Sequence, residues 1–91
     1  LRAGPDDAYQ EALNTASDLG WVVVESNSTT RTFEAEDETS VFRFVDDIVV
    51  RVRPGSVGSV IDVRSTSRAG VGDMGANADR IRRFRAVLTS R

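Results

Sequence analysis

Cysteine, histidine and lysine are absent from this sequence of 91 residues. Without cysteine the chain can form neither a disulfide, nor a thiolate nucleophile, nor a sulfur-ligated zinc site. Without histidine it also lacks the commonest general base and the commonest metal ligand. Only carboxylate, arginine, serine and threonine side chains remain for chemistry. An enzymatic function is therefore disfavoured, and we expect neither a metal ion nor a cofactor.

Long apolar runs and an excess of either charge are also missing. The 12 basic and 14 acidic residues leave a net charge of -2, which argues against nucleic-acid binding through a broad positive face. No uncharged stretch approaches the length of a transmembrane span. The chain begins at Leu1 without a basic-then-apolar leader, so we expect a soluble segment excised from a longer protein. Its localisation is unknown, and membrane anchoring or export of the full-length protein stays open.

The length allows one domain over residues 1–91, and any binding site on so small a domain should be shallow. Residues 1–4 are expected to form a tail, followed by a helix at 5–19. Pro5 suits the first turn of that helix, and Gly20 is expected to end it.

Strand signals fill the middle of the chain. Short runs of β-branched and aromatic residues alternate with polar ones and are separated by turn clusters. They predict strands at 21–26, 31–37, 41–45, 47–53 and 59–67. Apolar residues then return at helical spacing, which predicts a closing helix at 76–89. Its apolar face is expected to carry Asn77, Ile81, Phe84 and Leu88.

This order of elements predicts an α+β fold, a two-layer sandwich in which an N-terminal and a C-terminal helix cover one face of an antiparallel sheet of four to five strands. Alternation assigns the inward positions to Phe33, Ala35, Phe42, Phe44, Ile48, Val50, Val52, Ile61 and Val63. The other face is expected to pair glutamates with arginines across the strands. Tyr9 and Trp21 are expected in the core or at its edge.

Asp46 and Asp47 interrupt what would otherwise be one long strand, so we expect a bulge or tight turn there. A carboxylate pair suits acid-base chemistry or, together with Asp73, a hard cation. Neighbouring residues of an extended strand point to opposite faces, however, so the pair would act together only at a turn. The spacing does not resemble a cation-binding loop.

Gly70, Gly72 and Gly75 spell the pattern GxGxxG between a predicted strand and a predicted helix. A dinucleotide site also needs a returning parallel strand, whereas here the helix runs to the end of the chain. We therefore interpret the glycines as a flexible turn, with a helix cap at Asp73 or Asn77.

Arginine side chains gather around the expected start of the last helix. Arg64 and Arg68 precede it and Arg80 lies in its first turns, where free backbone N–H groups suit a phosphate, sulfate or carboxylate. In the alternative interpretation, an internal ion-pair network already occupies these arginines. Its carboxylates would be Asp46, Asp47 and Asp73.

Asn77 lies on the apolar stripe of that helix, where its amide must find hydrogen-bond partners. We expect it to pin Ser65 or Ser67, to cap the turn, or to face a polar pocket at the sheet edge.

Two blocks, FRFVDDIVVRVRP and IDVRSTSRAGVGDMGANADRIRRF, resemble the uncharacterised bacterial and plastid family catalogued as domain of unknown function 1499. Its members share an aspartate pair, an Arg-Ser-x-Ser-Arg block, a glycine, an Asp-x-Gly-x-Asn element and an Arg-Ile-Arg helix. The matching positions here are Asp46, Asp47, Arg64, Ser65, Ser67, Arg68, Gly70, Asp73, Gly75, Asn77, Arg80, Ile81 and Arg82. Serine is common in the family at the position of Gly72, so the GxGxxG spelling is an accident of this sequence. The resemblance implies an architecture and a set of residues but no activity.

These observations predict a small binding or interaction module that recognises a small anion, or an acidic group on a protein partner, with Arg64 and Arg68 as ligands. The candidate residues are Asp46, Asp47, Arg64, Ser65, Ser67, Arg68, Asp73, Asn77 and Arg80. One alternative is a structural or oligomerisation domain in which this cluster is an internal scaffold and the sheet face binds a partner or a second copy. The other is a hydrolase or lyase with Asp46 or Asp47 as general base and arginine stabilising the developing negative charge.

Overall fold

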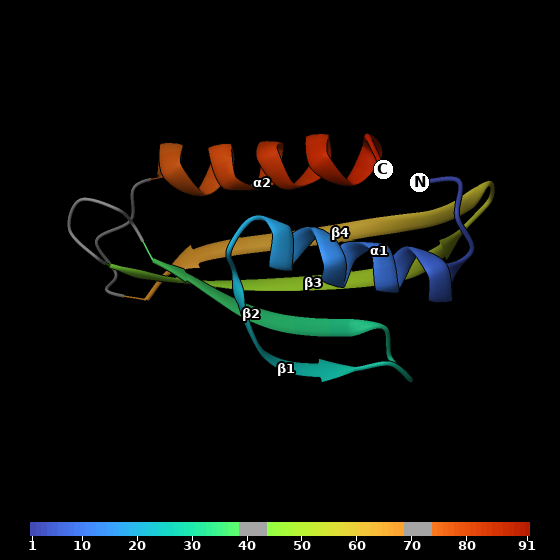
Figure 1. Cartoon of the computed structure of the whole chain (residues 1–91), viewed down its shortest axis with the longest axis horizontal. Helices are drawn as coiled ribbons and strands as arrows, with labels where there is room; N and C mark the ends of the chain where they lie inside the picture. The colour runs from blue at the N-terminus through green and yellow to red at the C-terminus, as the bar shows by residue number, and fades with distance from the viewer. Residues whose placement is uncertain (39–43, 69–73) are drawn as a thin grey trace.

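The computed structural model describes residues 1–38, 44–68 and 74–91. The described elements follow the order α1 (Pro5–Asp18), β1 (Val22–Asn27), β2 (Thr32–Glu38), β3 (Val45–Gly55), β4 (Gly58–Ser67) and α2 (Met74–Thr89). The strands form an antiparallel sheet in the order β1-β2-β3-β4, so each pairs with its neighbour in sequence (Figure 1). This is the α+β architecture expected from the sequence. No described helix is long and apolar enough to cross a membrane.

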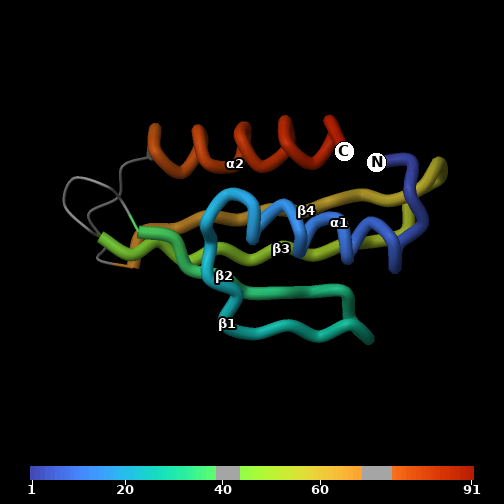
Figure 2. The backbone as a smooth tube through the Cα atoms, viewed as in Figure 1, coloured from blue at the N-terminus to red at the C-terminus, as the bar shows by residue number. Residues whose placement is uncertain are grey.

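The core lies between the sheet and the two helices. Every second side chain of the three strands β2 to β4 faces the core, as the alternation predicts, and Phe33, Ile48 and Val50 are among the largest that are fully buried. The inward residues near the end of β4, Val63, Ser65 and Ser67, are half-buried. α1 covers this side with a stripe of small residues, Ala8, Ala12 and Ala16. α2 lies alongside β4 and adds Phe84 and Leu88 (Figures 1 and 2).

The opposite side of the sheet is covered by no described element, and we call it the open face. Its side chains are Val22, Glu25, Asn27, Thr32, Glu34, Glu36, Glu38, Val45, Asp47, Val49, Arg51, Arg53, Val60, Asp62, Arg64, Thr66 and Arg68. Of the expected glutamate–arginine pairs on this side, Glu36 with Arg68 forms, and the other ion pairs are made by aspartates, Asp47 with Arg68 and Asp62 with Arg53.

Two aromatic contacts hold the helices on the core. The rings of Trp21 and Phe84 stack with centroids 5.0 Å apart, which joins the start of β1 to α2. Tyr9 is buried against Phe33, and its hydroxyl donates a hydrogen bond to the carbonyl of Thr32 at 3.3 Å. Both residues belong to the core, as predicted.

The N-terminal segment lies against the turn between β3 and β4. The backbone N–H of Ser59 donates to the carbonyl of Leu1 at 2.8 Å, and the Ser59 hydroxyl donates to the carbonyl of Ala3 at 2.8 Å. Gly58 has a φ of +90°, and a side chain there would collide with the backbone of Leu1 and Arg2. Glycine is therefore required both by the turn and by this close approach.

The predicted break at the aspartate pair is wrong, because β3 continues through it. Asp46 pairs across the sheet with Asp37 and Ser67, and Asp47 pairs with Glu36 and Thr66. Hydrogen-bonded neighbours on both sides hold the strand extended here. The predicted inward position of Phe44 is also wrong: it precedes the first residue of β3 and is 43% exposed.

Several expectations fall partly or wholly outside the described residues. They are most of the strand at 41–45, with Phe42, and the turn that holds Gly70, Gly72 and Asp73. The last helix begins at Met74, two residues earlier than expected. Asn77 therefore lies inside the helix, and the expectation that it caps the turn is wrong.

Candidate functional site

The polar residues singled out by the sequence divide between the two faces of the sheet. Successive side chains of a strand point in opposite directions, so Asp46 lies under α2 and Asp47 lies on the open face. Asp46 is 2% exposed, whereas the side chain of Asp47 is 43% exposed. The two carboxylates therefore cannot act together on one bound molecule.

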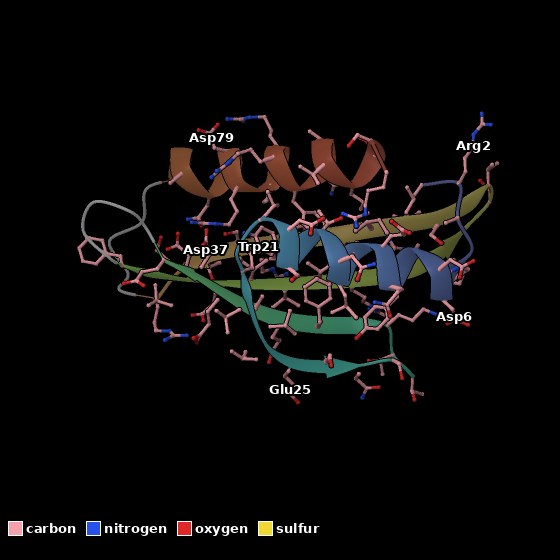
Figure 3. The ribbon with its side chains drawn as sticks, viewed as in Figure 1. Arg2, Asp6, Trp21, Glu25, Asp37 and Asp79 are labelled. Atoms are coloured by element: carbon pink, nitrogen blue, oxygen red, sulfur yellow. The ribbon has the colours of Figure 1, made fainter. Side chains whose placement is uncertain are left out.

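A network centred on Arg80 fills the space between the sheet and α2, and we call it the buried network. It consists of Asp37, Asp46, Ser65, Ser67, Asn77 and Arg80. The guanidinium of Arg80, which is 4% exposed, donates to Asp37 Oδ2 at 2.9 Å and lies 2.7 Å from Asp46 Oδ2. Figure 3 labels Asp37 between the sheet and α2.

The amide of Asn77 holds both serines of the network, which confirms the expectation that it pins Ser65 or Ser67. The Ser65 hydroxyl donates to Asn77 Oδ1 at 2.6 Å, and Asn77 Nδ2 donates to Ser67 Oγ at 3.2 Å. Arg80 Nη1 also donates to Asn77 Oδ1 at 2.9 Å and to Ser65 Oγ at 3.1 Å. These bonds join α2 to β4 one turn into the helix.

The buried network is satisfied from within. Asp37 and Asp46 are direct cross-strand partners, a like-charge arrangement that would be destabilising without the guanidinium that both share. Among the described residues, no buried side-chain nitrogen or oxygen lacks a hydrogen-bond partner. A ligand would have to break existing bonds to enter. The network thus fastens three strands to one helix, as in the ion-pair alternative.

A second cluster lies on the open face at the end of β4. Arg68 Nη2 contacts Asp47 Oδ1 at 2.5 Å and Glu36 Oε2 at 2.9 Å, and Arg68 Nε donates to Asp47 Oδ2 at 3.2 Å. The hydrogen bonds from Arg68 lower the pKa of Asp47, and the carboxylates of Asp47 and Glu36 raise the pKa of Arg68. Arg68, expected to be a ligand for an anion, is thus already held by two carboxylates.

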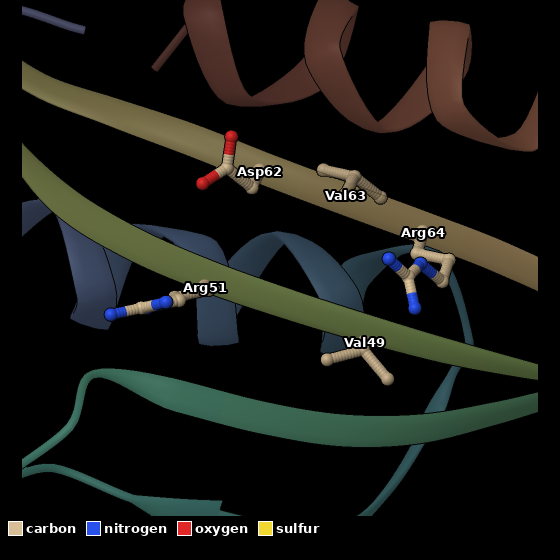
Figure 4. Close-up of a pocket in the computed structure, with 5 residues that line it drawn as sticks. All are labelled: Val49, Arg51, Asp62, Val63 and Arg64. Carbon is tan, nitrogen blue, oxygen red and sulfur yellow. The ribbon is translucent and has the colours of Figure 1, made fainter.

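Arg64 lies elsewhere on the open face, beside a depression of about 440 Å³ (Figure 4). The depression is lined by Val49, Arg51, Asp62, Val63 and Arg64. Asp62 is held by Arg53, whose Nε lies 2.5 Å from Asp62 Oδ2 and whose hydrogen bonds lower the pKa of Asp62. Arg51 and Arg64 are exposed, and neither forms a hydrogen bond or ion pair with any other residue that the structure describes.

The family described as "Protein of unknown function (DUF1499)" matches residues 1–88. The chain belongs to the DUF1499 family. The match covers almost the whole domain, so α1 and β1 are part of the family architecture along with the two blocks that carry the resemblance. The chain matches no curated protein. The family description assigns no activity, and the function of this DUF1499 domain has to be argued from its surfaces.

Three residues of the buried network and the open face were not among the predicted candidates, namely Asp37, Glu36 and Arg51. Asp37 shares the inward face of β2 with Phe33 and Ala35, and a charged residue in such a position requires a partner. That inward position was the available signal. Glu36 and Arg51 gave weaker signals, because outward charges on a strand are usually solvated or paired with their neighbours.

Metal chemistry has no support in the described part of the domain. No three acidic side chains there come together in a way that would hold a metal ion. Asp46 is already bound to Arg80, and Asp47 is bound to Arg68 on the opposite face. Asp73, the third carboxylate of the hard-cation hypothesis, lies outside the described residues.

Proposed function

We propose that this domain is a small binding module whose open face recognises a small anion or an acidic group, with Arg51 and Arg64 as the ligands. The observation that carries the proposal is the depression that both arginines line, because neither exposed guanidinium forms a hydrogen bond or ion pair with another described residue. Asp62 lies opposite Arg51 and also lines the depression, but its carboxylate is already bound by Arg53. The buried network acts as the scaffold that holds α2 on the sheet.

The spacing of the two arginines supports recognition of one acidic group by both. Val49 is the cross-strand partner of Arg64, and Arg51 follows Val49 by two residues on the same face of β3. Arg51 and Arg64 are therefore diagonal neighbours on adjacent strands, with a backbone separation of about 7 to 8 Å. Long side chains at that separation can both reach one carboxylate or phosphate, and guanidinium groups bind such oxygens with charge-assisted hydrogen bonds.

Arg68 is the weaker candidate of the two arginines expected from the sequence. An incoming anion would have to compete with Asp47 and Glu36, which already contact its guanidinium. Arg64 carries no such partner among the described residues. The proposal therefore keeps Arg64, moves the second ligand to Arg51, and leaves Arg68 as part of the surrounding surface.

Thermal unfolding at low ionic strength, with and without pyrophosphate, sulfate, citrate or a short polyglutamate peptide, tests this proposal. A ligand at 100 times its dissociation constant stabilises by about 2.7 kcal/mol, which is several degrees for a domain of this size. We expect wild type to respond to at least one probe and the double variant Arg51→Gln, Arg64→Gln to lose the response. Both positions are exposed, so the variant should keep its fold.

The matched control is Arg2→Gln, Arg83→Gln, which removes the same charge from exposed arginines outside the open face. This control should respond like wild type. If both double variants lose the response equally, the anion responds to the net charge of the domain and not to this site. If Arg51→Gln, Arg64→Gln responds as strongly as wild type, the proposed site is refuted.

A further inference from the structure

Charge is distributed unequally over the open face. Its β1–β2 half carries glutamates, and its β3–β4 half carries all of its arginines. Some of these charges cancel within the chain: Arg53 binds Asp62, and Arg68 binds Asp47 and Glu36. Two pairs form no hydrogen bond or ion pair with another described residue, namely Glu25 with Glu34 on one half and Arg51 with Arg64 on the other. Arg51 lies opposite Asp62 and its charge acts on that carboxylate, which is bound by Arg53.

This separation of charge is clearest along one line of cross-strand partners, which we call a row. Glu25 pairs with Glu34, Glu34 with Val49, and Val49 with Arg64, so a single line crosses the four strands from acid to base. The two glutamates are directly opposite each other, an unfavourable arrangement for like charges. Strands are about 4.8 Å apart, so the backbone of Arg64 lies roughly 10 Å from that of Glu34. No ion pair joins the two ends of the row within the described chain.

We propose that the open face docks on the open face of a second copy, with the two sheets packed face to face about a two-fold axis parallel to the strands. The inference rests on the proposed function, because the acidic group recognised by Arg51 and Arg64 is then supplied by Glu25 and Glu34 of the second copy. The contact is isologous, so the same two sets of side chains meet twice.

Rotation about the strand direction reverses each row, so Glu25 faces Arg64 of the second copy and Glu34 faces Val49, next to Arg51. In the next row Glu36 faces Asp47 of the second copy, and Arg68 already neutralises these two carboxylates within each copy. A two-fold axis across the strands would instead place glutamate on glutamate and arginine on arginine. Face-to-face packing with nearly aligned strands is also the common geometry of two-sheet proteins.

The face is large enough for such a contact and has apolar side chains to bury. The two longest dimensions of the domain are 39 and 23 Å, and a standard interface buries about 800 Å² on each partner. Val22 is 63% exposed and Val60 is 40% exposed, and Val49 lies between them in the centre of the face. Covering these valines gives the apolar core of the contact, while the charges fix its orientation.

Charge reversal on each half tests this docking by sedimentation equilibrium. We expect wild type to form a dimer that weakens as ionic strength rises. The variants Arg51→Glu, Arg64→Glu and Glu25→Arg, Glu34→Arg should each be monomers, because like charges then meet twice. An equimolar mixture of the two variants should restore a dimer containing one copy of each. The control Arg2→Glu, Arg83→Glu should dimerise like wild type.

A wild type that stays monomeric at low ionic strength overturns the self-docking, as does a dimer that survives both reversals or a mixture that does not associate. Pyrophosphate separates this failure from that of the proposed function. A monomeric wild type that still binds pyrophosphate through Arg51 and Arg64 refutes only the second copy as partner. A monomer without any anion response refutes both. If both hold, pyrophosphate should compete with the glutamates and dissociate the dimer.

Discussion

Asp46 and Asp47 are adjacent in sequence but are neutralised on opposite sides of the sheet by different arginines. Asp46 lies 2.7 Å from Arg80, which projects from α2, and Asp47 lies 2.5 Å from Arg68 at the end of β4. The first pair is almost fully buried, and the second is open to solvent. Removing the pair of Asp46 and Arg80 therefore tests how α2 is attached to the sheet. Removing the pair of Asp47 and Arg68 tests how the stability of the domain depends on pH in acid.

Replacing Arg80 should be the most damaging change at a charged position in the described domain. Arg80→Met leaves the buried Asp46 and the half-buried Asp37 without their shared cation, and breaking a buried ion pair from one side costs about 3 to 5 kcal/mol. Urea unfolding measures this loss. Arg83→Gln, on the exposed face of the same helix, is the control and should change the free energy of unfolding by at most about 0.5 kcal/mol.

A triple variant separates lost charge pairing from lost packing. Arg80→Met, Asp37→Asn, Asp46→Asn has no buried charge in this network, and neutral replacements of buried ion pairs are often tolerated. We expect it to be more stable than Arg80→Met alone. If it is less stable, packing and shape rather than unpaired charge account for the effect of Arg80.

Asn77 should contribute through its two serine partners. Asn77→Ala removes the acceptor of the Ser65 hydroxyl and the donor to Ser67, and leaving buried polar groups unsatisfied costs about 1 to 3 kcal/mol. A double-mutant cycle with Ser65→Ala measures the coupling, which for contacting residues is about 0.5 to 3 kcal/mol. Additive effects of the two changes would show that the hydrogen bond at 2.6 Å contributes nothing to stability.

Stability should fall in acid partly through Asp47. The hydrogen bonds from Arg68 lower its pKa in the folded state, so the folded domain binds this proton less readily than the unfolded chain. The contribution is therefore complete above the unfolded value, which is about 3.9 for aspartate, and is lost as pH falls through the lower folded value. Asp47→Asn should reduce the slope of stability against pH below about pH 4, the unfolded range for aspartate.

If Asp47→Asn and wild type lose stability in parallel between neutral pH and strong acid, the pair with Arg68 does not stabilise the fold. Because both side chains are exposed, we expect a modest effect.

The alternation of apolar and polar residues along the strands was enough to predict the layers of the fold. Inward residues such as Phe33 and Val52 have polar or charged neighbours, and when only one face of a sheet is covered, the apolar set must take that face. The same rule predicted that Asp46 and Asp47 would point apart. It failed at the aspartate pair only in expecting a break, because two charged residues in a row say nothing about the arginines available to each.

The partners of the polar residues were harder to predict. Whether Arg80 meets Asp46 or Asp47 depends on where α2 crosses the sheet, and no local pattern gives that position. Asn77 was easier, because an amide on an apolar stripe must find a partner and the nearest predicted polar residues were Ser65 and Ser67. Asp62 binds Arg53 and not Arg51, which lies directly opposite it, and sequence periodicity could not predict this, because it gives the face of a residue but not the contacts of a long side chain.

The position of Arg80 also has a consequence for the order in which the chain folds. Its partner Asp37 lies 43 residues earlier, so the two hairpins β2–β3 and β3–β4 have to close before the contact can form. Asp37 and Asp46 come side by side only when β2 and β3 have paired in the correct register. A slipped register between β2 and β3 would therefore not offer Arg80 this pair of carboxylates, and α2 would lose its polar attachment to the sheet while keeping its apolar contacts through Phe84 and Leu88.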